Sequence, residues 1–139
     1  MLFRSHATFE ISTKAVIYNE TATKVLVMEY RGGKFYGLPG GHLDLGETPI
    51  QAMRRELVEE LGVRDDFGLE PVDFFVHEGN IKRPRLILGY IGRIREDTPF
   101  VFDSHDYDER ALWMNREQLV ATEIADGYRT FISKHWPVS

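Results

Sequence analysis

Three glutamates with helical spacing are the residues of this sequence with the clearest chemical potential. On an α-helix, Glu56, Glu59 and Glu60 fall within an arc of about 100°, beside an apolar stripe. Like charges three and four residues apart repel one another, and anions in the last turn oppose the helix dipole. A positive group should therefore compensate them. A divalent cation such as Mg²⁺ or Mn²⁺, which prefers carboxylate oxygen, is suited to this role.

A simpler interpretation stays open for Glu-x-x-Glu-Glu taken alone. The carboxylates could form a solvated helix face that Arg54 and Arg55 neutralise. The glycine-rich loop before the helix bears on this choice, because the backbone carbonyl of Gly40 could supply a further metal ligand.

A helix over Thr48 to Leu61 must position these carboxylates. Its apolar stripe consists of Ile50, Met53, Leu57 and Leu61. Thr48 is suited to cap the helix, Pro49 to occupy its first position and Gly62 to end it.

Strands dominate the rest of the predicted structure. Phe9–Tyr18 and Lys24–Tyr30 are predicted to form a hairpin around a polar turn, Asn19–Thr23, and a shaped glycine-rich loop follows through Gly41. Further strands are predicted at Val72–Glu78, Leu86–Ile94 and Leu112–Met114, a helical turn at Arg116–Val120, and a C-terminal helix from Ile124 to Trp136.

Composition narrows the class of protein. The chain has 139 residues, 42% hydrophobic and 28% charged, which predicts a single globular domain over residues 1–139. Its apolar runs are too short to span a membrane and its start lacks a secretory pattern, so we expect a cytoplasmic protein. The absence of cysteine excludes disulfides and thiolate metal sites. A net charge of -5 argues against duplex nucleic acid as a partner but permits a small nucleotide.

A longer motif contains the three glutamates. The motif begins at Gly41, and after five residues it continues with Glu47. Seven residues later come Arg55-Glu56, then two residues, and then Glu59-Glu60-Leu61-Gly62-Val63. This string resembles a complete Nudix box of the MutT type, with every fixed position filled. The order of the flanking strands and helices is also similar to that of a Nudix domain.

The resemblance implies an α/β (α+β) fold, with a mixed β-sheet sandwiched between helices. It further implies hydrolysis of a diphosphate linked to another moiety, with Mg²⁺ or Mn²⁺ as cofactor. By this resemblance Glu56, Glu59 and Glu60 match the metal-ligand positions, and Glu56 could also orient or deprotonate the attacking water. Arg55 and Glu47 match positions that brace the loop against the helix. Gly41, Gly46 and Gly62 are read as backbone requirements.

The substrate is less constrained than the reaction. Leu38 to Glu47 resembles MutT-type nucleoside triphosphate diphosphatases, which favours conversion of a triphosphate to monophosphate and pyrophosphate. Hydrolysis of ADP-ribose or a nucleotide sugar stays an alternative, although the downstream proline that often accompanies it is missing. A non-catalytic nucleotide-binding module, a monomer and a homodimer also stay open.

Four residues outside the box are candidates for substrate or metal contact. Tyr36 could stack on a base or pack in the core, and Arg31 could bind a phosphate or simply occupy a turn. Arg85 belongs to a basic hairpin tip that could capture anions. Glu109 closes an acidic run with Asp103, Asp106 and Asp108 that could add a carboxylate to the site or form a solvated loop.

Overall fold

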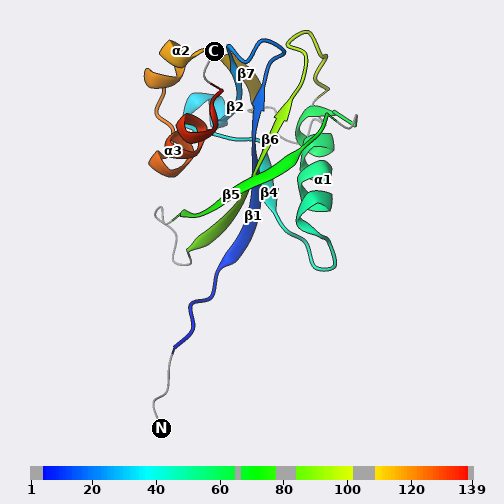
Figure 1. Ribbon diagram of the computed structural model, residues 1–139, viewed down its shortest axis with the longest axis vertical. Helices are drawn as coiled ribbons and strands as arrows, with labels where there is room; N and C mark the ends of the chain where they lie inside the picture. Colours follow the sequence, from blue (N-terminus) through cyan, green and yellow to red (C-terminus); the bar gives the residue numbers. More distant parts are fainter. Residues whose placement is uncertain (1–4, 65–66, 78–83, 102–108, 138–139) are drawn as a thin grey trace.

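The fold is a mixed β-sheet with helices on both faces (Figure 1). The computed structural model describes residues 5–64, 67–77, 84–101 and 109–137. The elements in chain order are β1 (Glu10–Tyr18), β2 (Val25–Tyr30), the 3₁₀ turn η1 (Arg31–Gly33), β3 (Phe35–Gly37), β4 (Gly40–His42), α1 (Pro49–Leu61), β5 (Glu70–His77), β6 (Arg85–Arg93), β7 (Arg110–Met114), α2 (Arg116–Val120) and α3 (Asp126–His135).

The long strand β1 organises the sheet. The main strand order is β3-β2-β1-β6-β5, and β4 and β7 pair with β1 and β2 respectively. β1 runs parallel to β6 along its whole length, whereas the other pairings are antiparallel. The first half of β1 pairs with β4, with Lys14 opposite Gly40. This pairing brings the glycine-rich segment onto the centre of the sheet.

Alternating side chains of β1 build two separate cores. Ala15 and Ile17 are fully buried with Met53 and Leu57 of α1. The intervening side chains, such as Val16, enter the other core, beneath α3. This alternation follows from the two-residue repeat of a strand. Figure 1 shows α1 on one side of the sheet and α2 and α3 on the other.

The sequence predicts most of these elements within a few residues. The hairpin, the helix over the box, both later strands, the short strand and the C-terminal helix are present, and the expected mixed-sheet fold is confirmed. The glycine-rich passage is more ordered than the predicted loop. It contains η1 and two short strands, β3 and β4, because its backbone groups pair with β2 and β1.

The predicted signals at both ends of α1 are confirmed. The Thr48 hydroxyl accepts from the Gln51 backbone N–H, and the Gln51 side chain accepts from the Thr48 N–H. Gly62 ends the helix in the left-handed region, with φ of 68°, and its N–H donates to Leu57 and Val58 carbonyls. Both ends are therefore fixed by hydrogen bonds, which holds the carboxylate-bearing turns in place.

A surface carboxylate ties the edge strand β5 to the end of α3. Asp73 accepts from Lys134 Nζ at 2.7 Å and from His135 Nε2 at 3.2 Å. These hydrogen bonds, with that to Lys134 the stronger influence, lower the pKa of Asp73 from 3.8 to about 2. The ionised form is therefore favoured in the folded protein.

We expect Asp73→Asn to lower stability at neutral pH and to flatten its decline in acid. The stabilisation from Asp73 is complete above the ordinary pKa of 3.8 and is lost as the pH falls through about 2. Urea unfolding at a series of pH values measures this effect, with exposed Asp126→Asn as the control. Parallel stability curves for wild type and Asp73→Asn would contradict it.

None of the helices in the described part of the chain is long and apolar enough to cross a bilayer.

Candidate active site

The glycines at the start of β4 place the loop directly beneath the last turns of α1. The Gly40 N–H donates to Glu60 Oε2 at 3.0 Å. Gly40 has a φ of +133°, and a Cβ there would lie 2.8 Å from the Thr13 carbonyl carbon and 2.9 Å from Lys14 Cα. Only glycine fits against the β1 backbone in this conformation. The loop and the carboxylates are thus joined through Gly40.

Glu56 lies over the next glycine. A Cβ on Gly41 would lie 2.6 Å from the Glu56 carboxyl carbon, so the missing side chain leaves the space that the carboxylate fills. The Glu56 side chain is only 14% exposed. Burial raises the pKa of this carboxyl above its usual range, and Arg55 opposes that shift. Glu56 is therefore a carboxylate that gains from a nearby cation.

Glu60 is the more strongly perturbed carboxyl. Burial raises its pKa to about 8, although the charge of Lys14 and the hydrogen bond from Gly40 act in the opposite direction. Such a perturbation marks candidate functional sites, because burying a carboxylate without full compensation is costly. Glu56 and Glu60 together form a partly buried acidic pair next to the Gly40 backbone.

Arg55 connects the loop to the helix. Its Nε and Nη2 donate to both Glu47 oxygens at 2.8 and 2.9 Å, and Nη2 also donates to the His42 carbonyl. Its Nη1 donates to Glu56 at 3.0 Å and Glu59 at 3.2 Å. The bidentate contact lowers the pKa of Glu47 to about 2, with help from the Asp44 N–H. These hydrogen bonds join Arg55 of α1 to Glu47 and His42 of the preceding loop.

The other predicted carboxylates differ in exposure. Glu59 is 56% exposed, so it faces solvent beside Arg55 rather than the buried pair. Glu109 is partly buried, and its charge contributes to the raised pKa of Glu60. The rest of the acidic run, Asp103, Asp106 and Asp108, lies outside the described residues.

Comparison with known proteins identifies this arrangement. The NUDIX domain model matches residues 8–135. The chain belongs to the Nudix family. An 8-oxo-dGTP diphosphatase of Haemophilus influenzae is 43% identical over 51 residues, which are 34% of this chain and 38% of the relative. A U8 snoRNA-decapping enzyme of Homalodisca vitripennis is 29% identical over 122 residues, 83% of this chain and 63% of the relative.

A solved structure shares the Nudix fold. The E. coli dihydroneopterin triphosphate pyrophosphohydrolase superposes with a TM-score of 0.76 at 19% identity, covering 92% of this chain and 97% of that one. The chain spans less than two thirds of the length of the two curated relatives named above. The comparisons therefore establish family and fold, as the sequence predicts.

The Nudix carboxylates suit a divalent ion, although they are not preassembled around one point. Among the described residues, no group of three or more Asp, Glu or His side chains already converges as a metal cage. Instead, Glu60 accepts from the Gly40 N–H and Glu56 lies over Gly41. Arg55 donates to Glu56 and Glu59. Mg²⁺ keeps several waters and uses few protein ligands, so this sparse set of oxygen donors fits it.

The three predicted substrate residues lie in different surroundings. Tyr36 donates from its hydroxyl to Glu29 Oε2 at 3.2 Å, and Glu29 also pairs with Arg110. Exposed Arg31 lies over the Phe35 ring. Arg85 lies on the α3 face of the sheet, where its Nε is buried and has no hydrogen-bond partner within the described part of the chain. Of the three, Arg85 thus has a donor that a ligand could use.

Lys14 is a functional candidate that the sequence alone did not reveal. Lys14 is 8% exposed in the middle of β1, and its charge acts on the pKa values of Glu60 and Glu56. The available signal was a lysine directly before the apolar residues Ala15, Val16 and Ile17 of a strand, because lysine is rarely buried.

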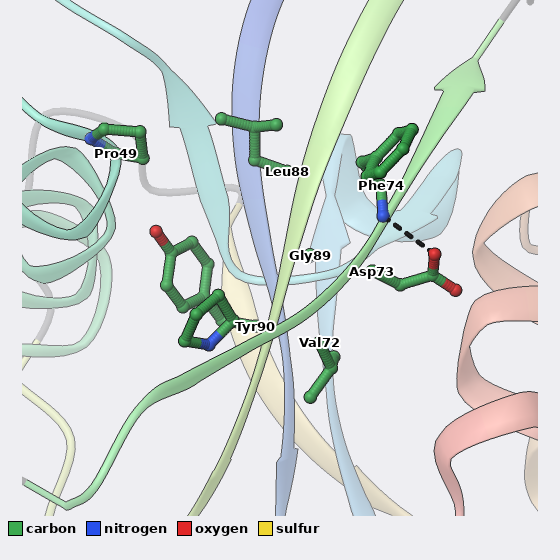
Figure 2. A pocket seen from close by; sticks show the side chains of 8 residues that line it. Pro49, Val72, Asp73, Phe74, Leu88, Gly89 and Tyr90 are labelled. Carbon is green, nitrogen blue, oxygen red and sulfur yellow. Dashed lines mark hydrogen bonds between the residues drawn. The ribbon is translucent and has the colours of Figure 1, made fainter.

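A separate pocket lies on the α1 face near the sheet edge. It measures about 400 Å³ and lies between the start of α1 and strands β5 and β6. Figure 2 shows residues that line it, among them Pro49, Tyr90 and Phe74. None of the box carboxylates lines this pocket, so its apolar walls are not the Nudix site.

We expect Arg55→Lys to lower activity by about 10- to 100-fold, the usual effect of removing a group that orients metal ligands. Lysine cannot make the bidentate contact to Glu47 while also reaching Glu56. Steady-state hydrolysis with Mg²⁺ measures the loss, and Arg54→Lys on the exposed side of α1 is the matched control. Equal losses in both variants would contradict a bracing role.

Proposed function

We propose that this chain is a metal-dependent Nudix hydrolase that cleaves a diphosphate linked to another moiety, most favourably a nucleoside triphosphate to monophosphate and pyrophosphate. The observation that carries the proposal is the partly buried pair of Glu60, which accepts from the Gly40 N–H, and Glu56, which lies over Gly41. An acidic pair with raised pKa values beside this glycine backbone is suited to hold Mg²⁺ or Mn²⁺.

In this proposal the carboxylates of Glu56, Glu59 and Glu60 and the Gly40 carbonyl hold the metal, and Glu109 can add a further oxygen. A bound divalent ion neutralises the diphosphate oxygens and supports the leaving phosphate. Glu56 orients or deprotonates the attacking water. Arg55 keeps Glu56 aimed at the loop, and Glu47 fixes Arg55.

The triphosphate substrate is supported by the chain's similarity to an 8-oxo-dGTP diphosphatase across 51 residues. Arg85 would contact the substrate from the α3 face of the sheet, and Tyr36 in β3 and Arg31 in η1 are further candidates for substrate contact. ADP-ribose or a nucleotide sugar is the second candidate substrate. We further propose a single-domain cytoplasmic protein, acting as a monomer or homodimer on a small nucleotide rather than on duplex nucleic acid.

A substrate panel tests the proposed function. The protein is incubated with Mg²⁺ or Mn²⁺ and one of four substrate classes: nucleoside triphosphates, ADP-ribose, nucleotide sugars or dinucleoside polyphosphates. Released phosphate is detected after coupling to pyrophosphatase or phosphatase. Preference for a triphosphate, lost in Glu59→Gln, is the expected result. Turnover of ADP-ribose alone would replace the substrate class, and a folded but inert protein would contradict the enzymatic proposal.

A further inference from the structure

Lys14 occupies an unusual position for a lysine. Its Nζ donates to the Leu38 carbonyl at 3.2 Å and to the Gly40 carbonyl at 3.0 Å, at the centre of the sheet. Burial lowers the pKa of Lys14, whereas the charges of Glu60 and Glu56 act against this shift. Keeping a charged group here is costly, and an apolar residue would fit the strand pattern better. The position therefore calls for a function.

The contact with Gly40 links Lys14 to the metal site. The Gly40 N–H donates to Glu60, while the Gly40 carbonyl accepts from Lys14. The proposed function assigns that same carbonyl oxygen to the divalent ion. Two positive groups cannot share one oxygen closely without repulsion. We therefore expect metal binding to weaken the contact between Lys14 and Gly40.

Donor groups without a hydrogen-bond partner lie on the same face of the sheet as Lys14. Ser12 and Lys14 project from β1 on the α3 face of the sheet, and Arg85 projects from the neighbouring strand on that face. The Ser12 hydroxyl and the Arg85 Nε are buried and have no hydrogen-bond partner among the described residues. Lys14, Ser12 and Arg85 thus form a row of donors, which we call the donor row. The two unpaired donors of this row, Ser12 Oγ and Arg85 Nε, indicate room for an anionic or oxygen-rich ligand beside Lys14.

We propose that Lys14 is the donor that moves from the Gly40 carbonyl to the substrate's diphosphate when a divalent ion takes that carbonyl. The proposal rests on the proposed function and extends it to a residue outside the box. A diphosphate supplies several acceptor oxygens next to the metal, and a lysine amino group donates to them as a mobile point charge. No bond is made or broken in this step.

Metal binding without turnover tests the first half of the proposal. Free Mn²⁺ is measured by electron paramagnetic resonance for the wild type, Lys14→Met and the distant control Lys24→Met. Removing the competing donor should tighten Mn²⁺ binding by about fivefold, the equivalent of one net hydrogen bond. Unchanged or weaker binding by Lys14→Met would overturn the exchange.

Binding of a non-hydrolysable diphosphate tests the second half. With Mn²⁺ saturating, imidodiphosphate affinity measured by calorimetry should fall by about 10- to 100-fold in Lys14→Met, as expected for a lost charged hydrogen bond. Unchanged affinity would overturn the role of Lys14 as a phosphate donor. If Lys14→Met does not fold, Lys14→Gln keeps an N–H donor without the charge and should lose the same affinity.

The controls separate this inference from the proposed function. Wild-type protein that binds no Mn²⁺, or binds it equally well after Glu60→Gln, would contradict the proposed function. Glu60-dependent Mn²⁺ binding with no response to Lys14→Met would contradict only the inference about Lys14.

Discussion

Glu60→Gln is expected to reduce metal-dependent hydrolysis by at least about 10³-fold, because the metal supplies several kcal/mol of stabilisation to the reacting phosphate. Glutamine keeps the size of the side chain and an oxygen that can accept from the Gly40 N–H. The substitution removes the negative charge of the carboxylate, and this charge is what attracts a divalent ion. The loss should therefore appear in activity and Mn²⁺ affinity rather than in the fold.

Stability distinguishes this prediction from a simple folding defect. Burial raises the pKa of Glu60 to about 8, so its ionised form is disfavoured in the metal-free protein. Replacing it with a neutral amide should leave thermal stability without metal unchanged or raised. Exposed Glu117→Gln on α2 is the matched control for loss of one carboxylate. Glu60→Gln that retains full activity, or that unfolds, would contradict the assigned role.

Gly40→Ala is expected to destabilise the fold by more than about 4 kcal/mol, a loss typical of backbone strain combined with a clash. The new methyl group would strike the Thr13 carbonyl group, and backbone atoms there cannot swing away as a side chain can. The φ of +133° adds strain for any residue with a Cβ. Because Gly40 joins β1 to Glu60, the same change should disrupt the carboxylate site.

Gly46→Ala provides a closely matched control for Gly40→Ala. Gly46 also has a positive φ, +86°, but a Cβ there would meet nothing within 4 Å. Only the left-handed conformation should then cost stability, roughly 1–2 kcal/mol. Urea unfolding of both variants separates conformational strain from steric clash. Similar losses in the two variants would show that the contact with Thr13 is unimportant.

The sequence determines the local parts of the site. The stripe Ile50, Met53, Leu57 and Leu61 fixes which face of α1 is buried. Thr48 and Gly62 fix the ends of the helix, and the fixed positions of the box place Arg55 next to Glu56. These features depend on residues a few positions apart, so a helical repeat and capping chemistry suffice to predict them. Family membership follows from the same short string.

Only the tertiary structure decides how these parts meet residues far along the chain. Lys14 reaches Gly40 across 26 residues because β4 pairs with β1, and β3 and β4 form only through such pairing. The fold also makes Glu60 partly buried and leaves Glu59 exposed, although both belong to the same motif. Burial and long-range strand pairing depend on which surfaces pack together, and neither is encoded in the spacing of neighbouring residues.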